Sequence, residues 1–135
     1  MSEELNWKED GDNSVKYEVQ DERMLQEAKA LQEERARYKK KSEETAKALV
    51  ENLKTTFSDV EVTYEIPYTT DIDVVLGDVR AAGLSAVVLQ HAIDFLESHD
   101  YHAFWVRPRG RKRVQILSSL KGDIIQKISQ EVSLI

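Results

Sequence analysis

Hydrophobic residues recur at helical spacing between positions 21 and 57, in a segment that has neither Gly nor Pro and is rich in strong helix formers. The pattern predicts a helix with two apolar stripes. They consist of Met24, Leu25, Ala28 and Leu31, and of Ala46, Leu49, Val50, Leu53 and Phe57. The charged piece between them, residues 33–42, is too polar to be buried. Ser42, followed by two glutamates, is typical of a helix N-terminus, so one long protruding helix or two shorter helices would fit.

Residues 59–67 alternate between polar and apolar side chains and predict a strand that ends at Pro67. The next segment, residues 71–82, is ambiguous. Thr70 and Asp73 have the spacing of a capping box for a short helix, whereas the apolar run at 74–76 equally suits a buried strand.

A second amphipathic helix is predicted from Ser85, as its N-cap, to about residue 99. Residues 102–106 and 114–117 then alternate like the two strands of a hairpin, and Pro108 and Gly110 in the connection favour a turn. Ser118 and Ser119 are expected to open a final helix. Its apolar stripe must be buried against the sheet of this chain or against another subunit.

These elements predict one α+β domain: a long N-terminal helix, then strand, helix, turn, helix, β-hairpin and helix. We expect a flexible arm over residues 1–20, with 15–19 as a short strand at most. A charged helix over 21–41 and a compact α+β domain over 42–135 follow. A coiled-coil homodimer through the first helix is an alternative, although its heptad positions fail at Arg35 and Ser42.

The composition narrows the class of protein. The chain has 135 residues and no Cys, which excludes disulfides, thiolate metal sites and cysteine nucleophiles. Its N-terminus lacks the cationic and apolar regions of a signal peptide, and no apolar run is long enough to span a membrane. We therefore expect a cytoplasmic protein, or a nuclear one in a eukaryote, with no contact with a membrane.

The net charge is −6, yet acidic and basic blocks alternate along the chain. Two concentrated basic segments suit local phosphate binding despite the negative sum. These candidate nucleic-acid-binding residues are Arg107, Arg109, Arg111, Lys112 and Arg113 in the hairpin connection, and Arg35, Arg37, Lys39, Lys40 and Lys41 in the first helix. The alternative is that these cations pair with acidic faces of the same chain or of a second copy.

Trp105 is a further candidate. Strand alternation places it with Ala103 and Arg107, on the face opposite Phe104 and Val106. An exposed indole beside arginines would stack on a base or anchor a protein contact. Alternatively, the indole covers an edge of the core with arginines lying across it.

The order of elements resembles a winged helix-turn-helix domain, with 71–82 as the first helix, 82–85 as the turn, 85–99 as the recognition-type helix and 104–117 as the wing. The resemblance implies a DNA-binding regulatory protein. The recognition-type helix offers only Gln90 and His91 as side chains that could read a groove. Binding mainly through the wing and the phosphates, or to a protein, would therefore be expected.

Asp71 and Asp73 resemble the strand motif of polymerase-β-like nucleotidyltransferases, which implies a small mixed sheet with packed helices and two divalent cations between carboxylates. The Gly-Ser loop of that family is missing from residues 60–70. Glu131 would supply a third carboxylate only if the C-terminal stretch were extended. Acidic residues in the first turn of a helix are the simpler interpretation of this pair.

His99, Asp100 and His102 suggest a helix-exit turn rather than a metal site, since no further ligand is evident. The sequence therefore predicts a non-catalytic regulatory or accessory protein without a cofactor, which binds nucleic acid through a basic β-hairpin. DNA is the first candidate ligand and RNA the second. The alternative is an adaptor or inhibitor that binds a protein through its acidic surface and apolar C-terminal helix. A metal-dependent transferase is the third hypothesis.

Overall fold

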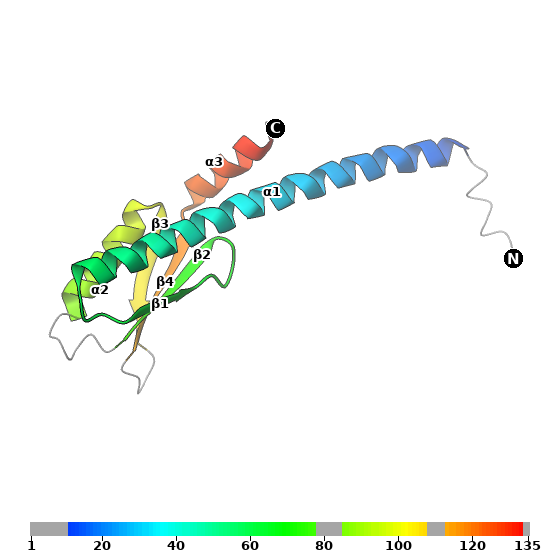
Figure 1. Cartoon of the computed structure of the whole chain (residues 1–135). Coiled ribbons are helices and arrows are strands. Elements are labelled where there is room, and N and C mark those ends of the chain that lie inside the picture. The colour runs from blue at the N-terminus through cyan, green and yellow to red at the C-terminus, as the bar shows by residue number, and fades with distance from the viewer. Residues whose placement is uncertain (1–10, 78–84, 108–112, 134–135) are drawn as a thin grey trace, which may run out of the picture.

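The computed structural model describes residues 11–77, 85–107 and 113–133, with the side chains of 11–20 and 85 left aside. In this part of the chain, three helices and a four-stranded antiparallel sheet confirm the α+β class (Figure 1). The elements are α1 (Gly11–Thr56), β1 (Val62–Glu65), β2 (Asp71–Leu76), α2 (Ser85–Ser98), β3 (Tyr101–Val106), β4 (Val114–Leu120) and α3 (Gly122–Ser133). Within the described ranges, none of the helices combines the length and apolarity that crossing a membrane requires.

Helix α1 is one continuous helix of 46 residues, which decides between the two alternatives left by the sequence. Ser42 does not begin a helix. It is fully buried in the middle of α1, where its Oγ donates a hydrogen bond to the Thr69 carbonyl oxygen (2.8 Å) and lies 2.7 Å from the Tyr101 hydroxyl. The expectation that residues 33–42 cannot be buried is therefore wrong at Tyr38 and Ser42, because both lie on the face of α1 that turns inward.

The first half of α1 projects well past the sheet (Figure 1). Every residue from 21 to 33 is exposed, and we call this segment the overhang. Residues 11–20 are helical, so the short strand considered at 15–19 is wrong.

The sheet has the strand order β1-β2-β4-β3. Asp71–Leu76 is therefore a central strand, paired with β1 on one side and β4 on the other, and the helix considered for this segment is wrong. The reason is its period: Ile72, Val74 and Leu76 alternate into the core and are fully buried, which a helix would not allow. The mixed sheet of the alternative fold is also wrong, since all three strand pairs are antiparallel.

Strand β4 continues to Leu120, so the final helix begins at Gly122 and not at the serines 118 and 119. Alternation again explains the difference, because Ile116, Ser118 and Leu120 all point into the core and Ser118 Oγ donates to the Ile72 carbonyl oxygen (2.8 Å). Helix α3 packs against α1 of the same chain. There Val132 is buried, and the Tyr38 hydroxyl donates to the Ile125 carbonyl oxygen (3.2 Å).

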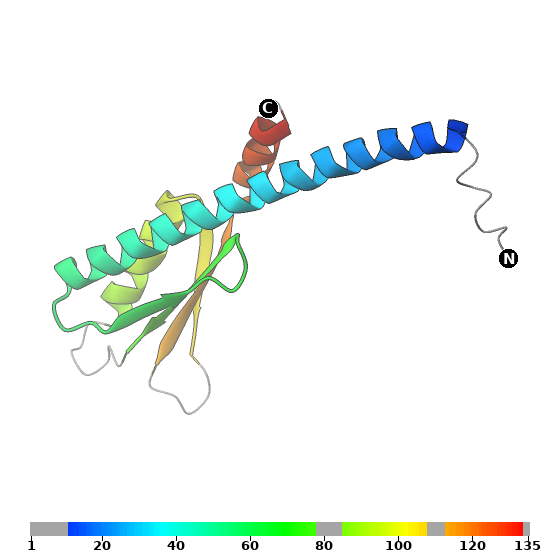
Figure 2. The same cartoon turned by 45° about the vertical axis from the view of Figure 1, so that its right-hand side comes forward.

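Helices α1 and α2 lie on the same face of the sheet, and the core fills the space between these two layers (Figure 2). Its largest fully buried side chains come from both helices and from three strands: Tyr101, Leu49, Leu53, Ile72, Leu76, Leu96, Ile116, Val74, Val88 and Val114. The other face of the sheet carries the outward residues of each strand, among them Asp71, Asp73 and Phe104. One face is thus a hydrophobic core and the other an open surface.

Candidate nucleic-acid interface

The β3–β4 hairpin has the position that the sequence predicts. Its register runs from Tyr101 opposite Leu120 to Val106 opposite Gln115, which brings Arg107 and Arg113 to the same end of the sheet. Both arginines are exposed. The other three candidate cations of the connection, Arg109, Arg111 and Lys112, lie outside the described residues.

Trp105 lies near this end of β3, and its side chain is 49% exposed. It lies on the side of the sheet that α2 covers, and it lines a hollow between the strand and the helix. The hollow has a volume of about 270 Å³ and is bounded by Ala86, Leu89, Gln90, Ile93, Trp105 and Arg107. The indole is thus both an edge of the core and an accessible aromatic surface beside a guanidinium.

Gln90 and His91 are neighbours on α2 but face different ways. Gln90 is exposed at the hollow, where its Nε2 donates to Asp94 Oδ1 (2.7 Å). The His91 ring is directed at α1: its Nε2 lies 2.6 Å from Asn52 Oδ1, and it meets the Phe57 ring edge-on at 5.4 Å. The structure therefore brings Gln90, but not His91, to Trp105.

Strand β3 is an outer strand of the sheet, and Glu97 occupies part of its free edge. Glu97 Oε2 accepts a hydrogen bond from the backbone nitrogen of Ala103 (2.8 Å), and Lys121 Nζ lies 3.6 Å from its other oxygen. The backbone hydrogen bond is the main cause that lowers the pKa of Glu97, and the neighbouring Lys121 and His102 side chains add to it. A carboxylate at this edge opposes pairing with a further strand, so we expect ligands to meet side chains here rather than the backbone.

The basic residues between positions 35 and 41 lie on two different faces of α1. Arg37 Nε lies 3.1 Å from Glu33 and its Nη1 lies 3.5 Å from Glu131, while Lys41 Nζ lies 3.1 Å from Asp100 Oδ2. For Arg37 and Lys41, the alternative of pairing with acids of the same chain therefore applies.

Arg35, Lys39 and Lys40 are exposed. Arg35 and Lys39 line a hollow of about 490 Å³ against the connection between β1 and β2, which contributes Ile66, Pro67, Tyr68 and Thr69. This hollow is not part of the hairpin site. Lys41 contacts the residue before β3, whereas Trp105 and Arg107 lie at its far end, roughly 20 Å along the strand.

Asp71 and Asp73 share the open face of β2, so their spacing is that of two carboxylates on one strand. The helix-start interpretation of this pair is wrong for the same reason. Partial burial, followed by the charges of Asp71 and Glu65, raises the pKa of Asp73. Glu131 lies on the helix α3 and pairs with Arg37. The C-terminal stretch is therefore not extended, which was the condition for Glu131 to supply a third carboxylate.

No cluster of three or more His, Asp or Glu side chains is arranged to hold a metal ion among the residues that the structure describes. The region around residues 99–102 forms the helix-exit turn that the sequence predicts. Asp100 has a φ of 77° there, a conformation common just after a helix, and His99 stacks on Phe95 with ring centroids 4.0 Å apart.

Sequence reasoning missed two features of this region. Phe104 is 58% exposed on the open face of the sheet, although an aromatic residue in an alternating strand suggests burial. The apolar wall of the Trp105 hollow was also missed. The spacing of Ala86, Leu89 and Ile93 places them on one side of α2, but only the packing of α2 on β3 shows that this side borders Trp105.

Comparison of the chain with protein-family models, curated proteins and solved structures found no match. The first helix that the winged-helix resemblance requires would include residues 71–76, which form β2, and the turn at 82–85 lies largely outside the described residues. A helix layer on a small antiparallel sheet is not diagnostic of that family. Function must therefore be argued from the site.

Proposed function

We propose that this protein binds nucleic acid without catalysing a reaction, through the open end of the β3–β4 hairpin. One observation supports the proposal above others: the half-exposed indole of Trp105 borders a hollow together with Arg107 and Gln90. The hollow lies at the base of a connection whose residues 107–113 contain five cations.

The side chains around the hollow have complementary chemical roles. The indole offers a face on which a base can stack, and Leu89 and Ile93 provide an apolar wall beside it. Arg107 and Arg113 carry fixed positive charge for phosphates, and the Gln90 amide has both donors and an acceptor for a base edge. Stacking requires an unpaired base, so the site favours single-stranded nucleic acid over a duplex.

The charge pattern suits local binding. A net charge of −6 repels a polyanion from most of the surface, whereas the hairpin end concentrates positive charge. Each phosphate neutralised on a single strand contributes about −0.7 to the slope of log affinity against log salt. We therefore expect affinity to fall steeply with salt.

Fluorescence anisotropy with labelled single-stranded DNA, single-stranded RNA and duplex DNA tests the proposal. Replacement of all five cations of the connection by Ala is expected to abolish binding, and Trp105→Ala to weaken it about 5- to 150-fold, since a stacked base contributes about 1–3 kcal/mol. The double variant Arg107→Ala with Arg113→Ala is expected to weaken binding and reduce the salt slope.

The matched control is Lys47→Ala with Lys54→Ala, which removes two exposed cations from α1 and changes the net charge equally. If both double variants weakened binding equally, total charge rather than the hairpin end would control affinity. Unchanged affinity in the variant without the five cations would contradict the proposal.

Binding to another protein is the second candidate function. The observation that favours it is the set of exposed apolar side chains on the overhang, since α3 already packs against α1 of the same chain. Self-association of the intact chain with no affinity for nucleic acid, even at low salt, would support this second function over the first.

A further inference from the structure

The apolar face of α1 does not end where the sheet ends. Ser42, Leu49 and Leu53 are buried on the side of α1 that faces the sheet. Met24 precedes Ser42, and Leu31 precedes Leu49, by eighteen residues, which is five full turns, so both lie on the same side of the helix. The helix therefore carries its inward-facing stripe into the overhang, where the chain has no sheet to cover it.

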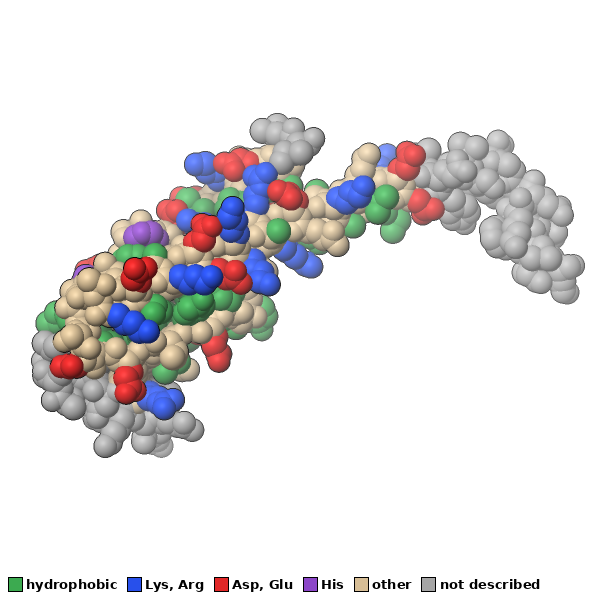
Figure 3. Space-filling view, in the orientation of Figure 1, with side chains coloured by type: hydrophobic (Ala, Val, Ile, Leu, Met, Phe, Trp, Pro, Cys, Tyr) green, Lys and Arg blue, Asp and Glu red, His purple; other side chains and the backbone are tan. Residues whose placement is uncertain are grey.

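Hydrophobic side chains are accordingly visible on the overhang, apart from those of the core (Figure 3). Met24 is 64% exposed, Leu25 56% and Leu31 46%. An isolated helix of this length is only marginally stable in water, because most helical stability in proteins comes from packing of an apolar face. An exposed apolar stripe of this kind is typical of a surface that packs against a partner.

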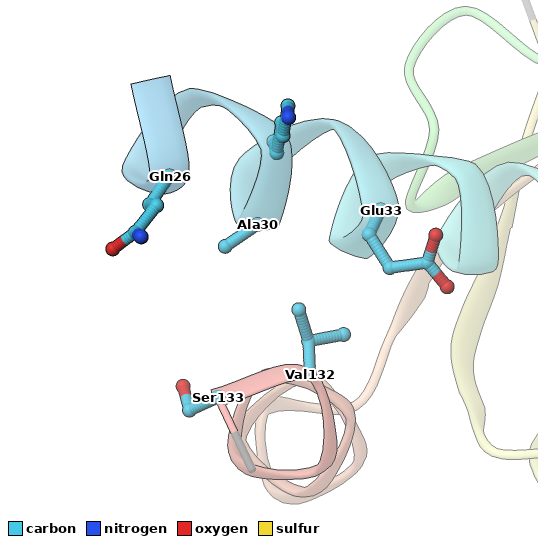
Figure 4. Close-up of a pocket in the computed structure, with 6 residues that line it drawn as sticks. Gln26, Ala30, Glu33, Val132 and Ser133 are labelled. Atoms are coloured by element: carbon cyan, nitrogen blue, oxygen red, sulfur yellow. The ribbon is translucent and has the colours of Figure 1, made fainter. Parts of the chain in front are cut away.

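Helix α3 does not cover this stripe. It approaches the overhang on the side of Ala30 and Glu33, across a hollow of about 710 Å³ to which α3 contributes Val132 and Ser133 (Figure 4). Two residues along a helix correspond to a rotation of about 200°, so Ala30 lies almost opposite Ala28, which belongs to the exposed stripe. The stripe and α3 therefore occupy opposite sides of the overhang.

The charges at the ends of the stripe indicate which partner fits. Asp21 and Arg35 lie seven residues before and seven residues after Ala28, so both are on the stripe side. An antiparallel second helix of the same sequence, centred on Ala28, would place its Arg35 against Asp21 and its Asp21 against Arg35. A parallel copy would place like charges together at both positions, which opposes that arrangement.

We propose that two copies of this chain associate through their overhangs, as an antiparallel, two-fold symmetric pair of helices that cross near Ala28, so that the first turns of each α1 pass beside the sheet of the other copy. The same surface of each copy forms the interface, as closed dimers require. The apolar stripes cover one another, and the two Asp21–Arg35 pairs flank them. The exposed Tyr68 lies beside Arg35 in the hollow between α1 and the β1–β2 connection, and extends the surface available to the second copy.

Measuring the mass of the full chain in solution over a range of concentrations tests the association. The wild-type chain is expected to approach twice 15.5 kDa as concentration rises. Met24→Ser with Leu31→Ser is expected to remain monomeric and to keep the packed core, because neither side chain belongs to it. The matched control is Val87→Ser, which removes an exposed hydrophobic side chain from α2 and is expected to dimerise like the wild type.

The chain has no Cys, so single cysteines can report the orientation. Positions 21 and 35 of one helix are about 21 Å apart, far beyond the Cα separation of about 4–7 Å that a disulfide spans. An oxidised mixture of Asp21→Cys and Arg35→Cys chains is expected to yield the cross-link between unlike chains, whereas each variant alone is expected to yield little. A monomer at all concentrations, a dimer insensitive to the Met24 and Leu31 substitutions, or efficient self-linking of Asp21→Cys would overturn the proposal.

Discussion

Among single residues, Ser42 and Tyr101 make a polar contact inside the hydrophobic core. The Tyr101 hydroxyl is buried with its ring, and Ser42 links it to the Thr69 carbonyl oxygen before β2. Burial raises the pKa of Tyr101, so the group remains a neutral partner at ordinary pH. A buried hydroxyl needs such partners, because leaving it unsatisfied is costly.

Ser42→Ala is therefore expected to lower the free energy of unfolding by about 1–3 kcal/mol, since the buried Tyr101 hydroxyl and the partly buried Thr69 carbonyl oxygen each lose a hydrogen-bond partner. Urea denaturation measures the change. Ser133→Ala, at an exposed serine whose Oγ donates only to a carbonyl of its own helix, is the control and is expected to change stability by less than about 0.5 kcal/mol. Equal effects of the two substitutions would contradict the role given to Ser42.

Asp73 is expected to make the stability of the folded state depend on pH. Its pKa is raised above the ordinary value of 3.8, so its ionised form is disfavoured in the folded state. Protonation of Asp73 therefore stabilises the folded state. This gain is complete at pH values below the pKa of Asp73 in the unfolded chain, and it is lost as the pH rises through the pKa of Asp73 in the folded state. Asp73→Asn is expected to raise the melting temperature at pH 7 and to have little effect at pH 3. Thermal unfolding at both values measures it, and a destabilised variant at pH 7 would refute the assignment.

The same residues show how far sequence reasoning extends. The local pattern around Ser42 is that of a helix start, and only contact with Thr69 and Tyr101, 27 and 59 residues away, makes it a buried tether in mid-helix. The alternation of Trp105 with Ala103 and Arg107 was predictable, because the period of a strand fixes it. Its accessible indole was not, because that depends on how α2 packs beside it.

At the scale of elements, local periodicity predicted the hairpin and the amphipathic helix at 85–99 well. It failed where two periods competed: the run at 74–76 fits a helix or a strand, and two neighbouring partners in the sheet decide for the strand. The start of α3 was misplaced because Ser118 and Ser119 resemble helix caps, whereas Ser118 instead bonds across the sheet. In both cases tertiary contacts override the local secondary-structure propensity.

Helix α1 shows the division of one element into a packed half and a projecting half. Leu49→Ala removes a fully buried side chain between α1 and the sheet, and is expected to cost about 2–5 kcal/mol. Lys47→Ala, two positions earlier and exposed, is expected to change stability by less than about 0.5 kcal/mol. Chemical denaturation distinguishes them, and a small effect of Leu49→Ala would mean that α1 is not part of the core.

At the scale of the whole molecule, the structure separates two surfaces. The hairpin end carries the Trp105 hollow and the basic connection, whereas the overhang projects from the opposite end of the sheet (Figure 1). Self-association through the overhang would therefore leave the proposed nucleic-acid site accessible in both copies. The Met24 and Leu31 variant is expected to keep the intrinsic affinity of one site for a short oligonucleotide, which anisotropy at matched chain concentration measures.

In the proposed function, Trp105 stacks on a base while the neighbouring cations hold the phosphates. The chain has two tryptophans, so Trp7→Phe leaves Trp105 as the single indole that reports binding. In this variant we would titrate unlabelled single-stranded oligonucleotide at low and high salt and record tryptophan emission. We expect saturable quenching that weakens with salt and is lost on replacing Arg107 and Arg113 by Ala. No quenching at low salt, or binding detected by anisotropy with unchanged Trp105 emission, would contradict it.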